Sequence, residues 1–114
     1  EVMEGFLKKY DDIDVLIAQN DNMAFGAIDA IEAAGLVPGK DIIIISIDAV
    51  KAALEEIVAG RINASIECNP LHGPRVAEII RKLEAGEPVE KKIYVNEEIF
   101  DIKNAAERLP TREY

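Results

Sequence analysis

The sequence predicts an α/β domain with three layers, in which a mainly parallel, doubly wound sheet lies between two layers of helices. Segments 13–18 and 42–47 are nearly continuous apolar runs rich in β-branched residues, which is typical of strands covered by helices on both faces. Apolar residues recur at helical spacing in the segments between such runs. Strands and helices therefore alternate, which implies parallel strands joined by right-handed crossovers.

The sequence predicts four helices and four strands that alternate along the chain. We expect helices within residues 1–10, 23–34, 50–58 and 76–83, each with an apolar stripe on one side. We expect strands at residues 13–18, 42–47, 62–68 and 92–95, the last being short and polar-flanked like an edge strand. Three of the helices are followed by a glycine suited to a left-handed C-terminal cap, namely Gly35, Gly60 and Gly86.

The beginning of the chain is unusual for this fold. A doubly wound domain normally starts on a strand, whereas residues 1–10 carry Val2, Phe6 and Tyr10 on one helical face. We therefore expect residues 1–114 to form a single partial domain that lacks its first strand. The alternative is that this helix simply caps one edge of the sheet.

Composition narrows the class of function. The chain has 114 residues, of which 49% are apolar and 31% charged, as in one globular domain. The formal net charge of −9 argues against nucleic acid or an anionic membrane as a partner, because both need a basic surface. A single cysteine excludes an internal disulfide. The segment after the first strand has Asn and Asp in place of glycines, which disfavours a dinucleotide cofactor, and we expect no cofactor.

Polar residues gather where the predicted strands end. Ligands of open α/β sheets bind beyond the carboxyl ends of the strands, and the candidates are Asn20 and Asp21 after the first strand, Asp48 at the end of the second, and Glu67, Cys68 and Asn69 at the end of the third. Carboxylates and amides suit sugar hydroxyls, which both donate and accept hydrogen bonds. Equally, one of Asn20, Asp21 and Asn22 could be only the cap of the helix that follows, and Asp48 could cap the next one, because caps favour these residue types.

Cys68 and His72 are the only residues of their kinds. Their spacing could suggest a thiolate–imidazole pair or half a metal site. No further cysteine or histidine completes a ligand set, and no orienting partner is evident. We therefore expect neither catalysis nor metal binding at this position.

Residues 18–27, 39–48 and 63–70 resemble three segments of the type I periplasmic sugar-binding proteins. The first matches the pattern A-x-N-D-x-M-A-x-G-A, the second a strand that ends in aspartate, and the third the strand and loop that close the site. The similarity runs from about residue 1 to residue 100 and is closest to the galactofuranose-type branch, ahead of the ribose and galactose types.

This resemblance implies a flavodoxin-like lobe of a two-lobed protein that closes on a monosaccharide and delivers it to the membrane permease of an ABC transporter. The chain would supply part of the C-terminal lobe, without the N-terminal lobe, and the protein would be extracytoplasmic, either periplasmic or lipid-anchored. By position, Asn20 and Asp48 match the family's sugar contacts. The third contact, usually an amide, aligns with Cys68, which is a weak donor and acceptor. Glu67 or Asn69 could supply it instead.

Two other functions share this fold. One is the sugar-effector domain of a transcriptional regulator related to the lactose repressor, which often carries a second aspartate where this chain has Ala49. The other is an enzyme on a flavodoxin-like scaffold, but no nucleophile, base or cofactor loop is visible, so we expect no enzyme. An unpaired sheet edge could also recruit a second copy of the chain and form a homodimer.

Overall fold

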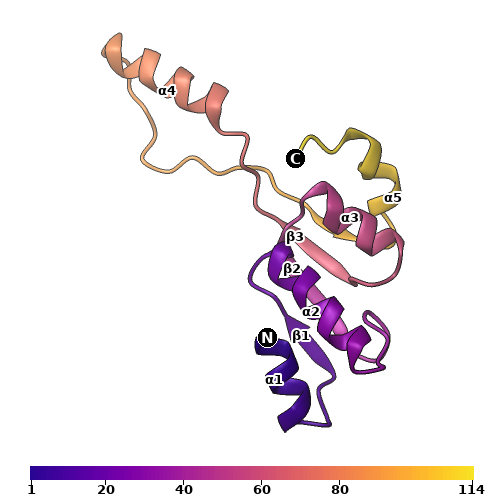
Figure 1. Ribbon diagram of the computed structural model, residues 1–114. Helices are drawn as coiled ribbons and strands as arrows, with labels where there is room; N and C mark the ends of the chain where they lie inside the picture. The colour runs from indigo at the N-terminus through magenta and orange to yellow at the C-terminus, as the bar shows by residue number, and fades with distance from the viewer.

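The structure of the protein, a computed structural model, describes all 114 residues. Its elements follow the order α1 (Val2–Lys9), β1 (Val15–Ile17), α2 (Asp21–Ala33), β2 (Ile43–Asp48), α3 (Lys51–Val58), β3 (Ala64–Glu67), α4 (Gly73–Glu84), β4 (Ile99–Asp101), α5 (Ala105–Arg108) and the 3₁₀ turn η1 (Leu109–Thr111). Figure 1 shows one sheet with helices packed along it, and α4 set apart from them. The predicted α/β class is confirmed.

The four strands form one mixed sheet in the order β1-β2-β3-β4. β1 pairs with β2 and β2 with β3 in parallel, whereas β3 and β4 are antiparallel. The first three strands lie where the sequence predicts them, and the sheet is mainly parallel as expected.

The prediction for the fourth strand is wrong. Residues 92–95 form no strand, and β4 lies at Ile99–Asp101 instead. Phe100 explains the difference, because its side chain is buried in the core while Ile93 and Tyr94 are exposed. The chain then adds α5 and η1, which the sequence analysis did not predict.

The core lies on one face of the sheet. α1 packs against α2, α2 packs against β2, and α3 packs against β3 and β4. The largest buried side chains of this layer include Ile31, Ile44, Leu54 and Ile57. The helices end as predicted, because the glycines that follow α2, α3 and α4 all have positive φ.

The opposite face of the sheet is not covered within this chain. Ile17 in β1 is 67% exposed and Ile99 in β4 is 62% exposed, and Val15 and Ile66 on this face are exposed as well. The expected second layer of helices is therefore not supplied by these residues, although the strand sequences are apolar on both faces.

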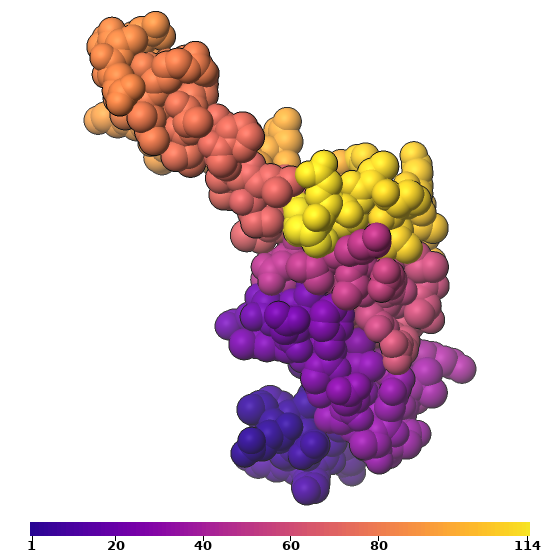
Figure 2. Space-filling view, turned by 45° about the horizontal axis from the view of Figure 1, so that its top comes forward, coloured from indigo at the N-terminus to yellow at the C-terminus, as the bar shows by residue number.

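α4 does not cover the exposed face of the sheet. It has no buried residue, and Val76, Ile80 and Leu83 of its apolar stripe are exposed. Figure 2 shows this helix projecting from the rest of the molecule. The radius of gyration is consequently 18.1 Å and the longest extent is 60 Å, whereas a compact chain of this length has a radius of about 13 Å. Neither α4 nor any other helix is long and apolar enough to cross a membrane.

Candidate functional site

The carboxyl ends of β1, β2 and β3 bring most of the predicted site residues to one edge of the sheet. Ile17 pairs with Ile45, so Asn20 and Asp48 each lie three residues further along neighbouring chain segments. Asp48 in turn pairs with Glu67. We call this edge, with residues 20, 48, 49 and 67–69, the rim. It is the position at which open α/β sheets bind ligands.

Asn20 is the N-cap of α2, so the capping alternative is realised. Its Oδ1 accepts a hydrogen bond from the Met23 backbone N–H at 2.8 Å, which fixes the orientation of the amide. The Nδ2 group makes no hydrogen bond within the protein, and the side chain is partly exposed. Asn20 therefore combines a structural role with two unused donors at the rim.

Asp48 ends β2 in an unusual backbone conformation. Its φ is 109° and that of Ala49 is 57°, both in the left-handed region that side chains with a Cβ rarely adopt. The suggestion that Asp48 caps the next helix is wrong, because the N-cap of α3 is Val50. The partly exposed Asp48 carboxylate makes no hydrogen bond within the protein, so it is an available acceptor.

Asp21 lies beneath the rim rather than on it. Only 1% of the residue is exposed. Its Oδ1 accepts from the Ser46 hydroxyl at 2.5 Å and the Ser65 hydroxyl at 2.9 Å, and its Oδ2 accepts from the Val50 N–H at 2.8 Å. These bonds join the start of α2 to β2, β3 and the segment before α3, so Asp21 positions the rim from inside.

Glu67 is also internal, with 8% of the residue exposed. Its Oε1 accepts from Arg112 Nη1 at 2.7 Å and the Tyr114 hydroxyl at 2.6 Å, and its Oε2 accepts from the Glu98 N–H at 2.9 Å. Burial acts to raise the pKa of this carboxyl, but the hydrogen bonds from Tyr114, Arg112 and the Glu98 backbone outweigh it and the pKa is lowered. The pKa of the Tyr114 phenol is raised by burial and by its bond to Glu67.

Arg112 is a rim-supporting residue that the sequence analysis missed. Its guanidinium stacks between the Phe100 and Tyr114 rings, at 4.9 and 4.1 Å from their centroids. Only 9% of its side chain is exposed. The C-terminal segment carries no periodicity or motif that could have indicated this position.

The last two candidates lie where β3 leaves the sheet. Cys68 is exposed, and its backbone N–H donates to the Asp48 carbonyl at 3.2 Å. Asn69 Oδ1 accepts from the Leu71 N–H at 2.8 Å, and the Asn69 N–H donates to Glu97 Oε1 at 2.9 Å. The Asn69 Nδ2 group has no partner within the protein. His72 is the N-cap residue of α4, but its side chain makes no capping hydrogen bond. No group of three or more acidic, histidine or cysteine side chains could hold a metal ion.

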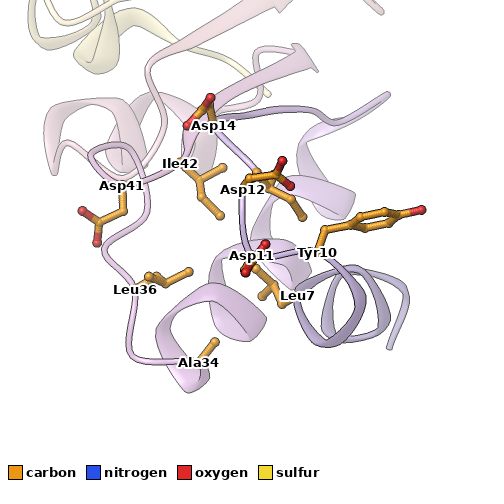
Figure 3. A pocket seen from close by; sticks show the side chains of 10 residues that line it. Leu7, Tyr10, Asp11, Asp12, Asp14, Ala34, Leu36, Asp41 and Ile42 are labelled. Atoms are coloured by element: carbon orange, nitrogen blue, oxygen red, sulfur yellow. The ribbon is translucent and has the colours of Figure 1, made fainter.

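A hollow occurs at the opposite end of the sheet from the rim, where the strands begin. Figure 3 shows it between the end of α1, the end of α2 and the segments that lead into β1 and β2. Leu7, Leu36 and Ile42 contribute apolar surface, and Asp11, Asp12, Asp14 and Asp41 surround it with carboxylates. One of these, Asp41, already accepts from the Val37 N–H at 2.7 Å. The hollow lies at the amino ends of the strands and shares no residue with the rim.

The rim therefore offers amide donors from Asn20 and Asn69 and an acceptor carboxylate from Asp48. Such groups can bind an uncharged ligand with several hydroxyls.

The chain is similar to known proteins over most of its length. The periplasmic binding protein domain model matches residues 1–85. The fructose import binding protein FruE of Bifidobacterium longum is 41% identical over 117 residues, which covers 99% of this chain and 35% of that protein. The galactofuranose-binding protein YtfQ of Escherichia coli is 37% identical over 113 residues, which covers 96% of this chain and 36% of that protein.

Two solved structures are similar over nearly the whole chain. A protein from Mycobacterium smegmatis in complex with β-D-fucofuranose is 46% identical with a TM-score of 0.92, over 99% of this chain and 37% of that one. The periplasmic binding component of the arabinose ABC transporter from Shewanella, bound to α- and β-L-arabinofuranose, is 35% identical with a TM-score of 0.88, over 98% and 38%. The chain thus spans less than two fifths of the length of these relatives.

Proposed function

Because the chain belongs to the periplasmic binding protein domain family, we propose that it is part of the solute-binding component of an ABC transporter and binds a monosaccharide. The observation that carries this proposal is the pair of unpartnered groups at one edge of the sheet. Asn20 presents amide donors and Asp48 presents a carboxylate acceptor. Neighbouring sugar hydroxyls would satisfy both at once.

The ligand that fits best is a sugar in its furanose form. Two of the similar structures hold β-D-fucofuranose and L-arabinofuranose, and YtfQ is named for galactofuranose. A neutral sugar also suits the formal net charge of −9, which would repel an anionic ligand.

Asn69 supplies the third contact in this proposal. Both Glu67 oxygens already have internal partners, and Cys68, although exposed, is a weak hydrogen-bonding group. The Asn69 amide nitrogen has no partner within the protein, so it can donate to a hydroxyl without breaking an existing bond.

The proposal includes the setting of the protein. FruE is named an import binding protein and the Shewanella protein a periplasmic component of an ABC transporter, which supports an extracytoplasmic location and a permease partner. It also favours sugar transport over the transcriptional-regulator alternative and over an enzyme. The sugar would lie between this lobe and a second, N-terminal lobe that these residues do not include.

The test separates the capping role of Asn20 from its ligand role. Asn20→Asp keeps an oxygen that can accept from the Met23 N–H but removes the amide donors. We expect unchanged thermal stability and a loss of about tenfold or more in affinity for L-arabinose or D-fucose, measured by calorimetry, because a lost hydrogen bond leaves a polar group unpaired. Asp48→Asn should weaken binding similarly.

Asp14→Asn is the matched control, since Asp14 is exposed at the opposite edge of the sheet. Affinity that is unchanged in both rim variants would refute the assignment of these residues. Failure of the two-lobed protein to bind any pentose, hexose or ketose would refute the function.

The outer edge of β1 is unpaired, because β1 is the first strand of the sheet. We include in the proposal that isolated copies of this chain associate through that edge. Light scattering of concentrated protein should give twice the mass of one chain, and a monomeric mass would exclude the homodimer.

A further inference from the structure

The two-residue turn at Asp48 and Ala49 is held from both sides by buried side chains. Both residues have positive φ, a conformation that persists only where surrounding contacts enforce it. On one side, the Ala49 N–H donates to the Ser65 hydroxyl at 3.1 Å and the Val50 N–H donates to Asp21. These contacts fix the amide groups of the turn.

Arg112 fixes the carbonyl groups. Its Nε donates to the Ala49 carbonyl at 2.6 Å, and its Nη2 lies 3.5 Å from the Asp48 carbonyl. The same guanidinium donates to Glu67 and to the Tyr114 hydroxyl. One planar group therefore links both carbonyls of the strained turn to a buried carboxylate.

The guanidinium is itself immobilised. It lies between two aromatic rings, and the Tyr114 carbonyl accepts from the Lys51 N–H at 2.6 Å, which ties the chain end to the start of α3. A planar fork of donors is needed here, since a lysine ammonium cannot stack in the same way or present donors in a plane.

We propose that Arg112 is a positioning residue that holds Asp48 in the conformation required to bind the ligand, so that the C-terminal segment 109–114 controls sugar affinity without touching the sugar. This inference rests on the proposed function for its effect on binding. Its structural part concerns only the conformation of residues 48 and 49. Without Arg112, the turn would relax, and apparent affinity would fall with the fraction of molecules that keep the binding conformation.

The experiment measures the two consequences separately. Arg112→Ala and Arg112→Lys are compared with wild type by backbone NMR shifts of Asp48 and Ala49, which report the sign of φ, and by calorimetric titration with L-arabinose. We expect both variants to shift these two residues toward negative φ and to weaken binding by about tenfold or more. Arg112→Lys keeps a positive charge beside Glu67, so it remains folded if the alanine variant does not.

Arg61→Ala is the matched control. Arg61 also makes a forked contact with a carboxylate, Glu56, but it lies before β3 at the opposite edge of the sheet. This variant should keep wild-type shifts at residues 48 and 49 and wild-type affinity.

A merely structural role for Arg112 would lower the melting temperature while leaving the Asp48 and Ala49 signals and the affinity of the folded protein unchanged, and that result would overturn the inference. If the two-lobed protein binds no sugar, the proposed function fails, and the NMR shifts alone decide whether Arg112 holds the turn.

Discussion

Replacing Asp21 with asparagine tests whether the rim is held from below by a buried carboxylate. The aspartate accepts three hydrogen bonds, from the hydroxyls of Ser46 and Ser65 and from the Val50 N–H. Asparagine has nearly the same shape, but one of the two oxygens becomes an NH₂ donor. In either orientation, the NH₂ group of the new amide therefore faces a group that donates a hydrogen bond to Asp21 in the wild type.

The magnitude follows from these contacts. If the NH₂ group faces Val50, a fixed backbone N–H loses its acceptor. If it faces the serines, their hydroxyls must reverse, although Ser65 Oγ already accepts from the Ala49 N–H. At least one buried, charge-assisted hydrogen bond is lost, which corresponds to about 2–3 kcal/mol of unfolding free energy and roughly 10 °C in melting temperature.

Urea unfolding followed by circular dichroism measures this loss, with an unchanged m-value to show that the same cooperative unit unfolds. Asp14→Asn makes the same chemical change at an exposed aspartate and should alter stability by less than about 0.5 kcal/mol. A loss of less than about 0.5 kcal/mol in Asp21→Asn would refute the argument that this carboxylate joins the elements of the rim.

Three further predictions concern stability. Asn20→Ala removes the cap bond to Met23 and should cost about 1 kcal/mol in thermal unfolding, whereas Asn20→Asp should cost nothing. The pKa of Glu67 is lowered, so its ionised form stabilises the fold above the ordinary glutamate pKa, and this contribution disappears as the pH falls through the lowered value. The unfolding free energy should therefore depend less on acid pH in Glu67→Gln than in wild type. An identical pH dependence in the two proteins would contradict a stabilising role for ionised Glu67. Gly39→Ala would place a Cβ 2.2 Å from the Gly60 carbonyl oxygen at a φ of +76°, so we expect at least about 2 kcal/mol of destabilisation, and wild-type stability would show that the loop can shift freely.

The sequence predicts the parts of the fold that local patterns encode. The apolar runs give β1 and β2, the glycines mark the ends of three helices, and Asn20 reads correctly as a helix cap. β4 could not be predicted because a three-residue strand with one buried side chain, Phe100, leaves almost no periodic signal in the sequence. The Ile93 and Tyr94 segment has the composition of a strand without a neighbouring strand to pair with.

The location of the candidate site could be predicted from the sequence, but not which of its residues point inward and which keep unpartnered groups at the rim. Polar residues at strand ends indicate a rim, and Asn20 and Asp48 keep unpartnered groups there. Nothing in the sequence shows that Asp21 and Glu67 point inward, because their partners Ser65 and Arg112 are 44 and 45 residues away along the chain. Such long-range hydrogen bonds depend on the assembled sheet.

Two apolar surfaces of the structure, one face of the sheet and the stripe of α4, are left uncovered for the same physical reason. β1 and β2 are apolar on both faces, so their sequences predict that another element packs on the side where Ile17 and Val15 are exposed. α4 likewise has an apolar stripe with nothing packed on it. A chain that spans 35–38% of the length of its relatives can leave such apolar surfaces uncovered even though its sequence pattern is normal for the fold. The rim differs, because the buried carboxylates that shape it find every partner within these 114 residues. The geometry of Asn20 and Asp48 is thus specified by this chain itself, while the enclosure of the proposed ligand depends on what faces the rim.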